Sequence, residues 1–240
     1  MKRFGLLGRS LGHSASAAYF NEKFRQEGRR DHHYQNFELP RISDFPALLQ
    51  QYPDLRGLNV TIPYKQAVMP YLSQLSATAQ AIGAVNTIVF EPRPCGYNTD
   101  ATGFWNSLAP HLQAHHRQAL VLGTGGASRA VSYALRQKEI PHRCVSRSPQ
   151  DDQLSYHAAA EALSDYPLLI NATPMGTFPD TDTLPPLVLD GLGPAHLVVD
   201  LIYNPPQTAL LEAAQQKGAA VLNGRPMLEA QAEAAWQLWQ

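Results

Sequence analysis

The sequence predicts an α/β protein built from two units. Short apolar runs alternate with longer amphipathic segments, which is typical of strands alternating with helices. The pattern starts again near Gln118, and a glycine-rich turn follows the next apolar run, Ala119–Leu122. We therefore expect an open mixed or parallel sheet in the first unit and a Rossmann-like sheet in the second. A ligand would bind in the crevice between them.

The first half of the chain divides at its glycines and prolines. Gly28 ends the first amphipathic run, Pro63 stops the third apolar run, and the proline-rich segment 91–96 reads as a turn. Strands are expected at 4–7, 33–39, 58–62 and 84–90, with helices at 15–27, 43–51, 74–82 and 101–113.

The second half repeats the alternation. Strands are expected at 119–122, 142–146, 168–170, 197–202 and 219–222, with helices at 126–138, 206–217 and 226–240. Pro226 is tolerated early in the last helix, and the proline-rich stretch 174–186 reads as a loop. The expected domains are 1–100 together with 224–240, and 101–223.

Composition narrows the class of protein. The chain has 240 residues, of which 44% are hydrophobic. Because its formal net charge is −1, it has no basic field to attract nucleic acid or anionic membrane. Cys95 and Cys144 do not form a C-x-x-C pair and read as reduced thiols. The first apolar run breaks at Gly8, too early for a signal peptide. The nine histidines include no H-E-x-x-H. We expect a cytoplasmic protein without a metal.

A glycine-rich turn predicts dinucleotide binding. Residues 123–128 (GTGGAS) follow an apolar run and open a helical pattern, the context that such a fingerprint requires. Gly123 allows the tight turn, Gly125 lets the backbone approach a pyrophosphate, and Ser128 permits close packing of helix and strand. The alternative is a glycine turn that holds no ligand.

The end of the next strand bears on the choice of cofactor. An NAD site usually has an acidic residue here, whereas this chain has Ser146, Arg147 and Ser148. A planar, permanently charged guanidinium suits a 2′-phosphate, which favours NADP. Asp151 and Asp152 would repel a phosphate if they faced it, and an exposed arginine is common at protein surfaces.

Two polar patches predict a site for a small polyol. Residues 59–65 (NVTIPYK) contain Lys65, and residues 98–100 (NTD) contain Asp100. A lysine beside an aspartate can transfer a proton, and the neighbouring Asn and Thr side chains can bind hydroxyl groups.

With these residues the chain resembles the shikimate dehydrogenase family along nearly its whole length. The matching motifs, in order, are 13–16 (HSAS), 59–65 (NVTIPYK), 83–87 (GAVNT), 98–100 (NTD), 123–128 (GTGGAS), 171–176 (NATPMG), 200–205 (DLIYNP) and 224–228 (GRPML) with Gln231. The resemblance implies NADPH-dependent reduction of 3-dehydroshikimate to shikimate, reversibly and without a metal.

The resemblance also implies a role for each matching residue. Ser14 and Ser16 would hold the substrate carboxylate, with Lys65 and Asp100 as the catalytic pair. The other implied substrate contacts are Asn59, Thr61, Asn86, Tyr203 and Gln231, with Asp100 also binding a ring hydroxyl. The implied cofactor contacts are Gly123, Thr124, Gly125, Gly126, Ala127, Ser128, Ser146, Arg147, Ser148, Thr173, Met175, Ile202 and Gly224.

Alternatives stay open at this point. Ser14 and Asp100 could cap helices, and Lys65 could be a solvated lysine. The chain departs from the family pattern at Ala17, usually proline, and lacks a second basic residue after Arg147. Two other functions compete: a quinate/shikimate dehydrogenase that uses NAD, and a shikimate-binding protein without catalysis. The sequence leaves a monomer and a homodimer equally open.

Overall fold

The computed structural model describes residues 1–12 and 14–240, so His13, at the start of the first motif, lies outside the described residues. The chain forms two compact units, Met1–Thr99 with Ala232–Gln240, and Asp100–Gln231. Within the described ranges, no helix combines the length and apolarity that crossing a bilayer requires.

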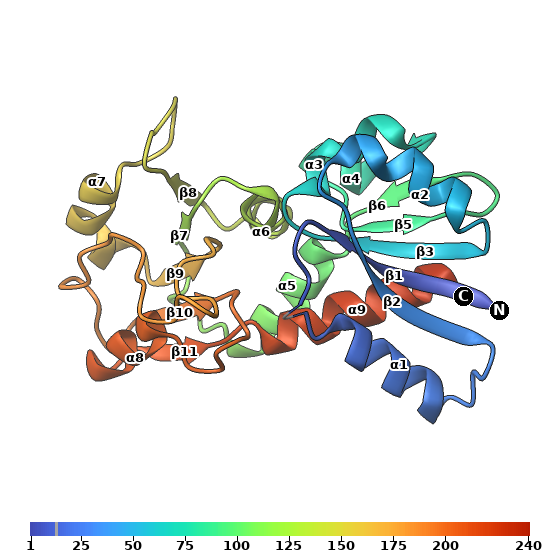
Figure 1. Cartoon of the computed structure of the whole chain (residues 1–240). Coiled ribbons are helices and arrows are strands. Elements are labelled where there is room, and N and C mark those ends of the chain that lie inside the picture. Colours follow the sequence, from blue (N-terminus) through green and yellow to red (C-terminus); the bar gives the residue numbers. More distant parts are fainter. Residues whose placement is uncertain (13) are drawn as a thin grey trace. The chain divides into compact units, whose positions relative to one another are not determined.

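The first unit is a mixed sheet with helices on both faces (Figure 1). Its described residues form six strands in the order β2-β1-β3-β5-β6-β4. The strands β2, β1 and β3 are parallel, with β2 at one edge of the sheet, whereas β5 runs antiparallel to β3 and to β6. The elements are β1 Lys2–Gly8, α1 Ser16–Gln26, β2 His32–Glu38, α2 Phe45–Gln51, β3 Leu55–Val60, α3 Tyr64–Ala67, β4 Gln74–Leu75, α4 Ala77–Ile82, β5 Thr87–Val89 and β6 Cys95–Tyr97.

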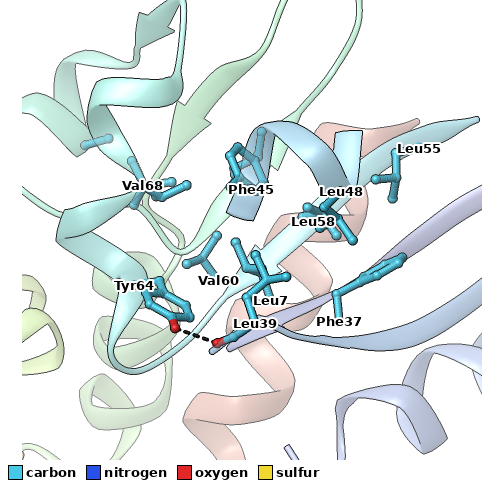
Figure 2. Packing of buried hydrophobic residues seen from close by; sticks show 13 residues of the cluster. Leu7, Phe37, Leu39, Phe45, Leu48, Leu55, Leu58, Val60, Tyr64 and Val68 are labelled. Carbon is cyan, nitrogen blue, oxygen red and sulfur yellow. Dashed lines mark hydrogen bonds between the residues drawn. The ribbon is translucent and has the colours of Figure 1, made fainter. Parts of the chain in front are cut away.

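Strand alternation builds a separate core on each face of this sheet. Leu7 pairs in register with Phe37 and Val60, and all three pack into the cluster beneath α2 and α3 (Figure 2). Phe4 points to the other face, where it pairs with Tyr34 and packs against α1 and the end of the last helix, α9 (Arg225–Trp239). The carboxyl ends of β1 and β3 are held between these two cores.

The second unit has an all-parallel sheet, β11-β10-β9-β7-β8 among its described residues. The chain runs outward from β7 to β8 and then returns to β9 on the other side of β7. This reversal is a topological switch point, where open α/β sheets bind ligands. The elements are α5 Asp100–Leu108, β7 Ala119–Leu122, α6 Gly126–Gln137, β8 His142–Val145, α7 Tyr156–Glu161, β9 Leu168–Asn171, β10 Leu197–Asp200, α8 Ala209–Gln216 and β11 Ala220–Leu222. Short 3₁₀ turns lie at Ile42–Asp44, Met69–Tyr71, Ala109–His111 and Leu163–Asp165.

The main departures from the expected elements lie in the first unit. Residues 74–75 form a strand where the sequence predicted helix, and Cys95–Tyr97 is a strand within and just after the expected turn. Both strands are very short: β4 pairs only with β6 among the described strands, and β6 lies between β4 and β5. Such pairing is a tertiary effect that local propensity does not encode. The helices α3 and α7 were also missed.

Candidate functional site

The glycine-rich turn leads from β7 into α6 and has the geometry of an anion cradle. Gly123 adopts φ +103°, a conformation that favours glycine, and the Ser128 hydroxyl donates to its carbonyl at 2.6 Å. Gly125 is the N-cap of α6 and makes no side-chain cap, and apart from its chain neighbours no heavy atom of the described residues lies within 4 Å of where its Cβ would be. Open space beside an N-cap that has no side-chain cap, at the start of a twelve-residue helix, suits a phosphate.

The loop after β9 lies directly beside this turn. A Cβ on Gly123 would come within 3.1 Å of the Thr173 methyl group. Thr173 is held by Asn171, whose Oδ1 accepts from the Thr173 amide at 3.0 Å and from its hydroxyl at 2.7 Å. The Met175 amide donates to the same hydroxyl at 3.3 Å. The switch point is thus lined by two ordered loops.

The loop after β10 is held by a buried carboxylate for which the sequence predicted no role. Asp200 is fully buried and accepts from the Ile202 amide at 3.1 Å. Burial raises the pKa of Asp200 to about 6, against the opposing effect of its hydrogen bonds. The Gly224 amide donates to the Ile202 carbonyl at 2.9 Å, and the Leu201 carbonyl fills the space of a Gly224 side chain. The sequence feature that could have indicated this role is an aspartate at the end of an apolar strand.

The residues after β8 lie at the same edge of the sheet. The Ser146 hydroxyl accepts from the Ser148 amide at 3.2 Å and shapes the turn around the exposed Arg147. Arg147 lies near Tyr156 of α7: burial raises the pKa of Tyr156, and the guanidinium charge opposes that rise. An exposed cation therefore lies at the end of the strand where a dinucleotide ribose is expected.

In the first unit, Asn59 joins two buried polar groups. Its Oδ1 accepts from the Tyr34 hydroxyl at 2.8 Å, and its Nδ2 approaches the Thr87 hydroxyl at 3.3 Å and the Asn86 carbonyl at 3.4 Å. Tyr34 was not predicted, because its position on β2 reads as an ordinary core residue. Ser16, at the start of α1, also hydrogen-bonds to Tyr34, and burial raises the pKa of this phenol well above its usual value.

Asn86 extends the same network toward the end of the unit. Its Oδ1 accepts from the Thr99 amide at 2.7 Å, and its Nδ2 donates to the Thr99 hydroxyl at 2.9 Å. Asn98 donates to the Ala84 carbonyl at 2.9 Å. These bonds fix Asn86 and Asn98 at buried strand ends, where the predicted polar motifs lie.

Ser14, Thr61 and Lys65 follow the carboxyl ends of β1 and β3. The Ser14 hydroxyl accepts from the Ser16 amide at 3.2 Å, and the Thr61 amide donates to the Leu7 carbonyl at 2.9 Å. Lys65 is half-buried on the short helix α3, whose backbone accepts from the Val85 amide at 2.7 Å. The first unit thus brings Ser14, Ser16, Thr61 and Lys65 to strand ends that also carry Asn59 and Asn86.

The other predicted substrate residues belong to the second unit. Asp100 is buried as the first residue of α5, and Tyr203 is half-buried just after β10. Gln231 lies on α9, where its Nε2 donates to the Leu228 carbonyl at 2.9 Å. Its backbone packs so closely on Gly103 of α5 that no side chain fits there. Across residues 1–12 and 14–240, no three His, Cys, Asp or Glu side chains gather in a way that could hold a metal ion.

All of the predicted cofactor residues from 123 to 202 follow the carboxyl ends of β7, β8, β9 and β10, which share one edge of a parallel sheet; Gly224 reaches this edge through Ile202. An all-parallel sheet with a glycine-rich turn at its switch point defines an α/β protein with a Rossmann-like unit.

Comparison with known proteins specifies the family. Residues 6–88 match the model of the "Shikimate dehydrogenase substrate binding domain". Shikimate dehydrogenase (NADP(+)) from Shouchella clausii is 37% identical, over 99% of this chain and 92% of that protein. The chain belongs to the shikimate dehydrogenase family.

Solved structures agree. The shikimate 5-dehydrogenase of Thermus thermophilus in complex with NADP(H) and shikimate superposes with a TM-score of 0.89 at 35% identity, over 100% of this chain and 94% of that one. Quinate dehydrogenase from Corynebacterium glutamicum in complex with NAD is also similar, with a TM-score of 0.87 at 27% identity, over 100% and 93%. The predicted fold class and family are confirmed.

Proposed function

We propose that the protein catalyses the reversible reduction of 3-dehydroshikimate to shikimate with NADPH. The observation that carries this is the polar cluster at the ends of β1 and β3, ending in Lys65, on a chain whose second sheet has a glycine-rich turn at its switch point. The relative from Thermus thermophilus, solved with both NADP(H) and shikimate, supports the same pairing of ligands. In this proposal residues 1–100 with 224–240 bind the substrate, and residues 101–223 bind the dinucleotide.

The second unit fits NADP. The uncapped amides at the start of α6 would receive the pyrophosphate, since a Cβ at Gly125 would fill the open space there. Arg147, with the Ser146 and Ser148 hydroxyls, would bind the 2′-phosphate through charge-assisted hydrogen bonds. The loops that contain Thr173, Met175 and Ile202 would lie against the nicotinamide, which supplies the hydride for the substrate carbonyl.

The first unit fits a polyhydroxylated carboxylic acid. Ser14 and Ser16 present hydroxyl groups beside the first amides of α1, where a carboxylate is favoured. Thr61, Asn59 and Asn86 offer neutral donors and acceptors suited to ring hydroxyls. Tyr203 and Gln231 complete the proposed set of substrate contacts.

Lys65 and Asp100 are the proposed acid–base pair. Hydride addition turns the carbonyl oxygen into an alkoxide, and a positioned ammonium group stabilises that charge and donates a proton. Asp100 would orient the ammonium group and accept a substrate hydroxyl. In the reverse direction the lysine receives the proton as shikimate is oxidised.

The direct test follows NADPH formation from shikimate. Lys65→Ala should lower kcat by about 10²–10⁴ because it removes a positioned proton donor. KM for shikimate should change much less. Lys217→Ala is the matched control, because Lys217 is a partly exposed lysine paired with the exposed Asp190. A Lys65→Ala enzyme with kcat within a few-fold of wild type would refute the assignment.

The nearest competing function is a quinate/shikimate dehydrogenase that uses NAD, favoured by the likeness to the quinate dehydrogenase. Arg147 argues for NADP. Arg147→Ala should raise KM for NADP by about tenfold or more and leave KM for NAD unchanged, since a charged hydrogen bond contributes about 1.5–3 kcal/mol. Arg136→Ala, at an exposed arginine in the last turn of α6, is the control. A higher kcat/KM for quinate with NAD would establish the competing function.

The non-catalytic alternative and the setting of the reaction have their own tests. Tight shikimate binding without NADPH formation would identify a binding protein.

Cys95 and Cys144 are both free thiols, which supports a cytoplasmic location. Light scattering on the purified protein would distinguish the monomer from the homodimer.

A further inference from the structure

A buried carboxylate lies at the strand ends beneath the predicted dinucleotide site. Asp200, the last residue of β10, is 0% exposed. It pairs in register with Asn171 of β9, which pairs with Leu122 of β7, the residue before Gly123. Burying an ionisable group costs free energy unless hydrogen bonds compensate, so its partners indicate what this carboxylate does.

Three donors from different segments converge on Asp200. Oδ1 accepts from the Asn171 Nδ2 at 3.0 Å and from the Ile202 amide at 3.1 Å. Oδ2 accepts from the Thr208 hydroxyl at 2.7 Å, and that hydroxyl also caps α8 by accepting from the Leu211 amide. The carboxylate therefore joins the loop after β9, the loop after β10 and the start of α8.

The ionised carboxylate fixes the orientation of the Asn171 amide. A carboxylate only accepts hydrogen bonds, so the Asn171 NH₂ group faces Asp200 and its oxygen faces Thr173. That oxygen then accepts from both the amide and the hydroxyl of Thr173, whose methyl group approaches Gly123. The loop that contains Thr173, beside the glycine-rich turn, thus depends on the charge of Asp200, to which it is linked through Asn171.

The same oxygen of Asp200 also sets the loop after β10. It holds the Ile202 amide, and the Ile202 carbonyl in turn accepts from Gly224. Thr173, Met175, Ile202 and Gly224 are all among the residues proposed to contact the cofactor. Every one of them is one or two hydrogen bonds from Asp200, with Met175 reached through the contact of Asn171 Nδ2 with its carbonyl at 3.5 Å.

We propose that Asp200 is a positioning residue that sets the affinity for NADP by holding the loops after β9 and β10, without touching either ligand. The inference rests on the proposed function, since it takes the dinucleotide as the ligand of this edge. Asp200 would thus be a buried group that fixes the geometry of the dinucleotide site.

The test compares two variants that each remove one partner of the same carboxylate. Asn171→Leu breaks the link toward Thr173, whereas Thr208→Val, of nearly unchanged shape, breaks the link toward α8. Calorimetric titration with NADP alone gives Kd, and thermal unfolding gives the loss of stability. Asn171→Leu should raise Kd and KM for NADP about tenfold, with KM for shikimate within twofold. Thr208→Val should lower Tm by about as much as Asn171→Leu does. Its Kd for NADP should stay within twofold of the wild-type value.

Asp200→Asn tests the carboxylate itself. The substituted amide can accept from Asn171 and Ile202 through its oxygen only when its NH₂ group faces the Thr208 hydroxyl, and the bonds that hold the loops then lose their charge assistance. Kd for NADP should rise several-fold while the protein stays folded. Equal Kd values for Asn171→Leu and Thr208→Val would overturn the proposal, as would wild-type protein that does not bind NADP. Wild-type protein that binds NADP yet does not oxidise shikimate would refute the proposed function and leave this test intact.

Discussion

Replacing Tyr34 by phenylalanine removes one buried hydroxyl, which hydrogen-bonds to both Asn59 and Ser16 in the proposed substrate site. The ring stacks on Phe20 with centroids 4.5 Å apart and planes at 12°, and Asn21 holds the Tyr34 backbone through two hydrogen bonds. Phenylalanine preserves the stacking, so the variant loses only the hydroxyl. That hydroxyl is buried and donates to the Asn59 Oδ1 at 2.8 Å.

The structure sets the size of the effect. Leaving the Asn59 oxygen without its buried donor costs about 1–3 kcal/mol of folding free energy. The amide also loses its shortest hydrogen bond, so only the longer contacts of Nδ2 with the Asn86 carbonyl and the Thr87 hydroxyl oppose its rotation. We expect KM for shikimate to rise about three- to tenfold, because a wrongly turned amide presents a donor where the substrate hydroxyl needs an acceptor. The affinity for NADP should not change.

Tyr64→Phe is the matched control. Tyr64 is also buried in the first unit, and its hydroxyl donates to the Leu39 carbonyl at 2.5 Å, on the side of the sheet shown in Figure 2. Urea unfolding should show both variants destabilised by a similar amount, whereas steady-state kinetics should show a higher KM in Tyr34→Phe alone. Equal KM values in the two variants, at equal stability, would refute the reasoning.

Two further predictions concern the second unit. Gly125→Ala should leave the midpoint of thermal unfolding unchanged, since the space beside Gly125 is empty, yet weaken NADP binding at least tenfold by blocking the anion cradle; tight NADP binding by this variant would contradict the site. Asp200 has a pKa raised from 3.8 to about 6, so its contribution to stability is fully present below the unfolded value and is lost as the pH rises through 6. Between about pH 4 and about pH 7, wild type should therefore lose about 2 kcal/mol of unfolding free energy relative to Asp200→Asn. Denaturant titrations at several pH values measure this difference. A difference that stays constant with pH would show that the carboxylate titrates normally.

Local sequence signals were sufficient for much of this molecule. The run Ala119–Leu122, the turn at Gly123 and the start of α6 at Gly126 appear where the sequence predicted them. Strand alternation, positive φ and the opening of a helix are properties of neighbouring residues, so a short window of sequence contains them. The family resemblance, carried by motifs in order along the chain, is confirmed for the same reason.

The sequence by itself therefore determined the α/β class, the glycine-rich turn and the family of the protein. Only the tertiary structure decided that Tyr34 holds Asn59, 25 residues away, and that Asp200 ties together the loops after β9 and β10. The short strands β4 and β6 likewise depend on pairing, since β6 lies between β5 and β4 in the sheet. Burial and hydrogen-bond partners depend on which distant segments the fold packs together, and a buried polar group acquires its role from those partners rather than from its neighbours along the chain.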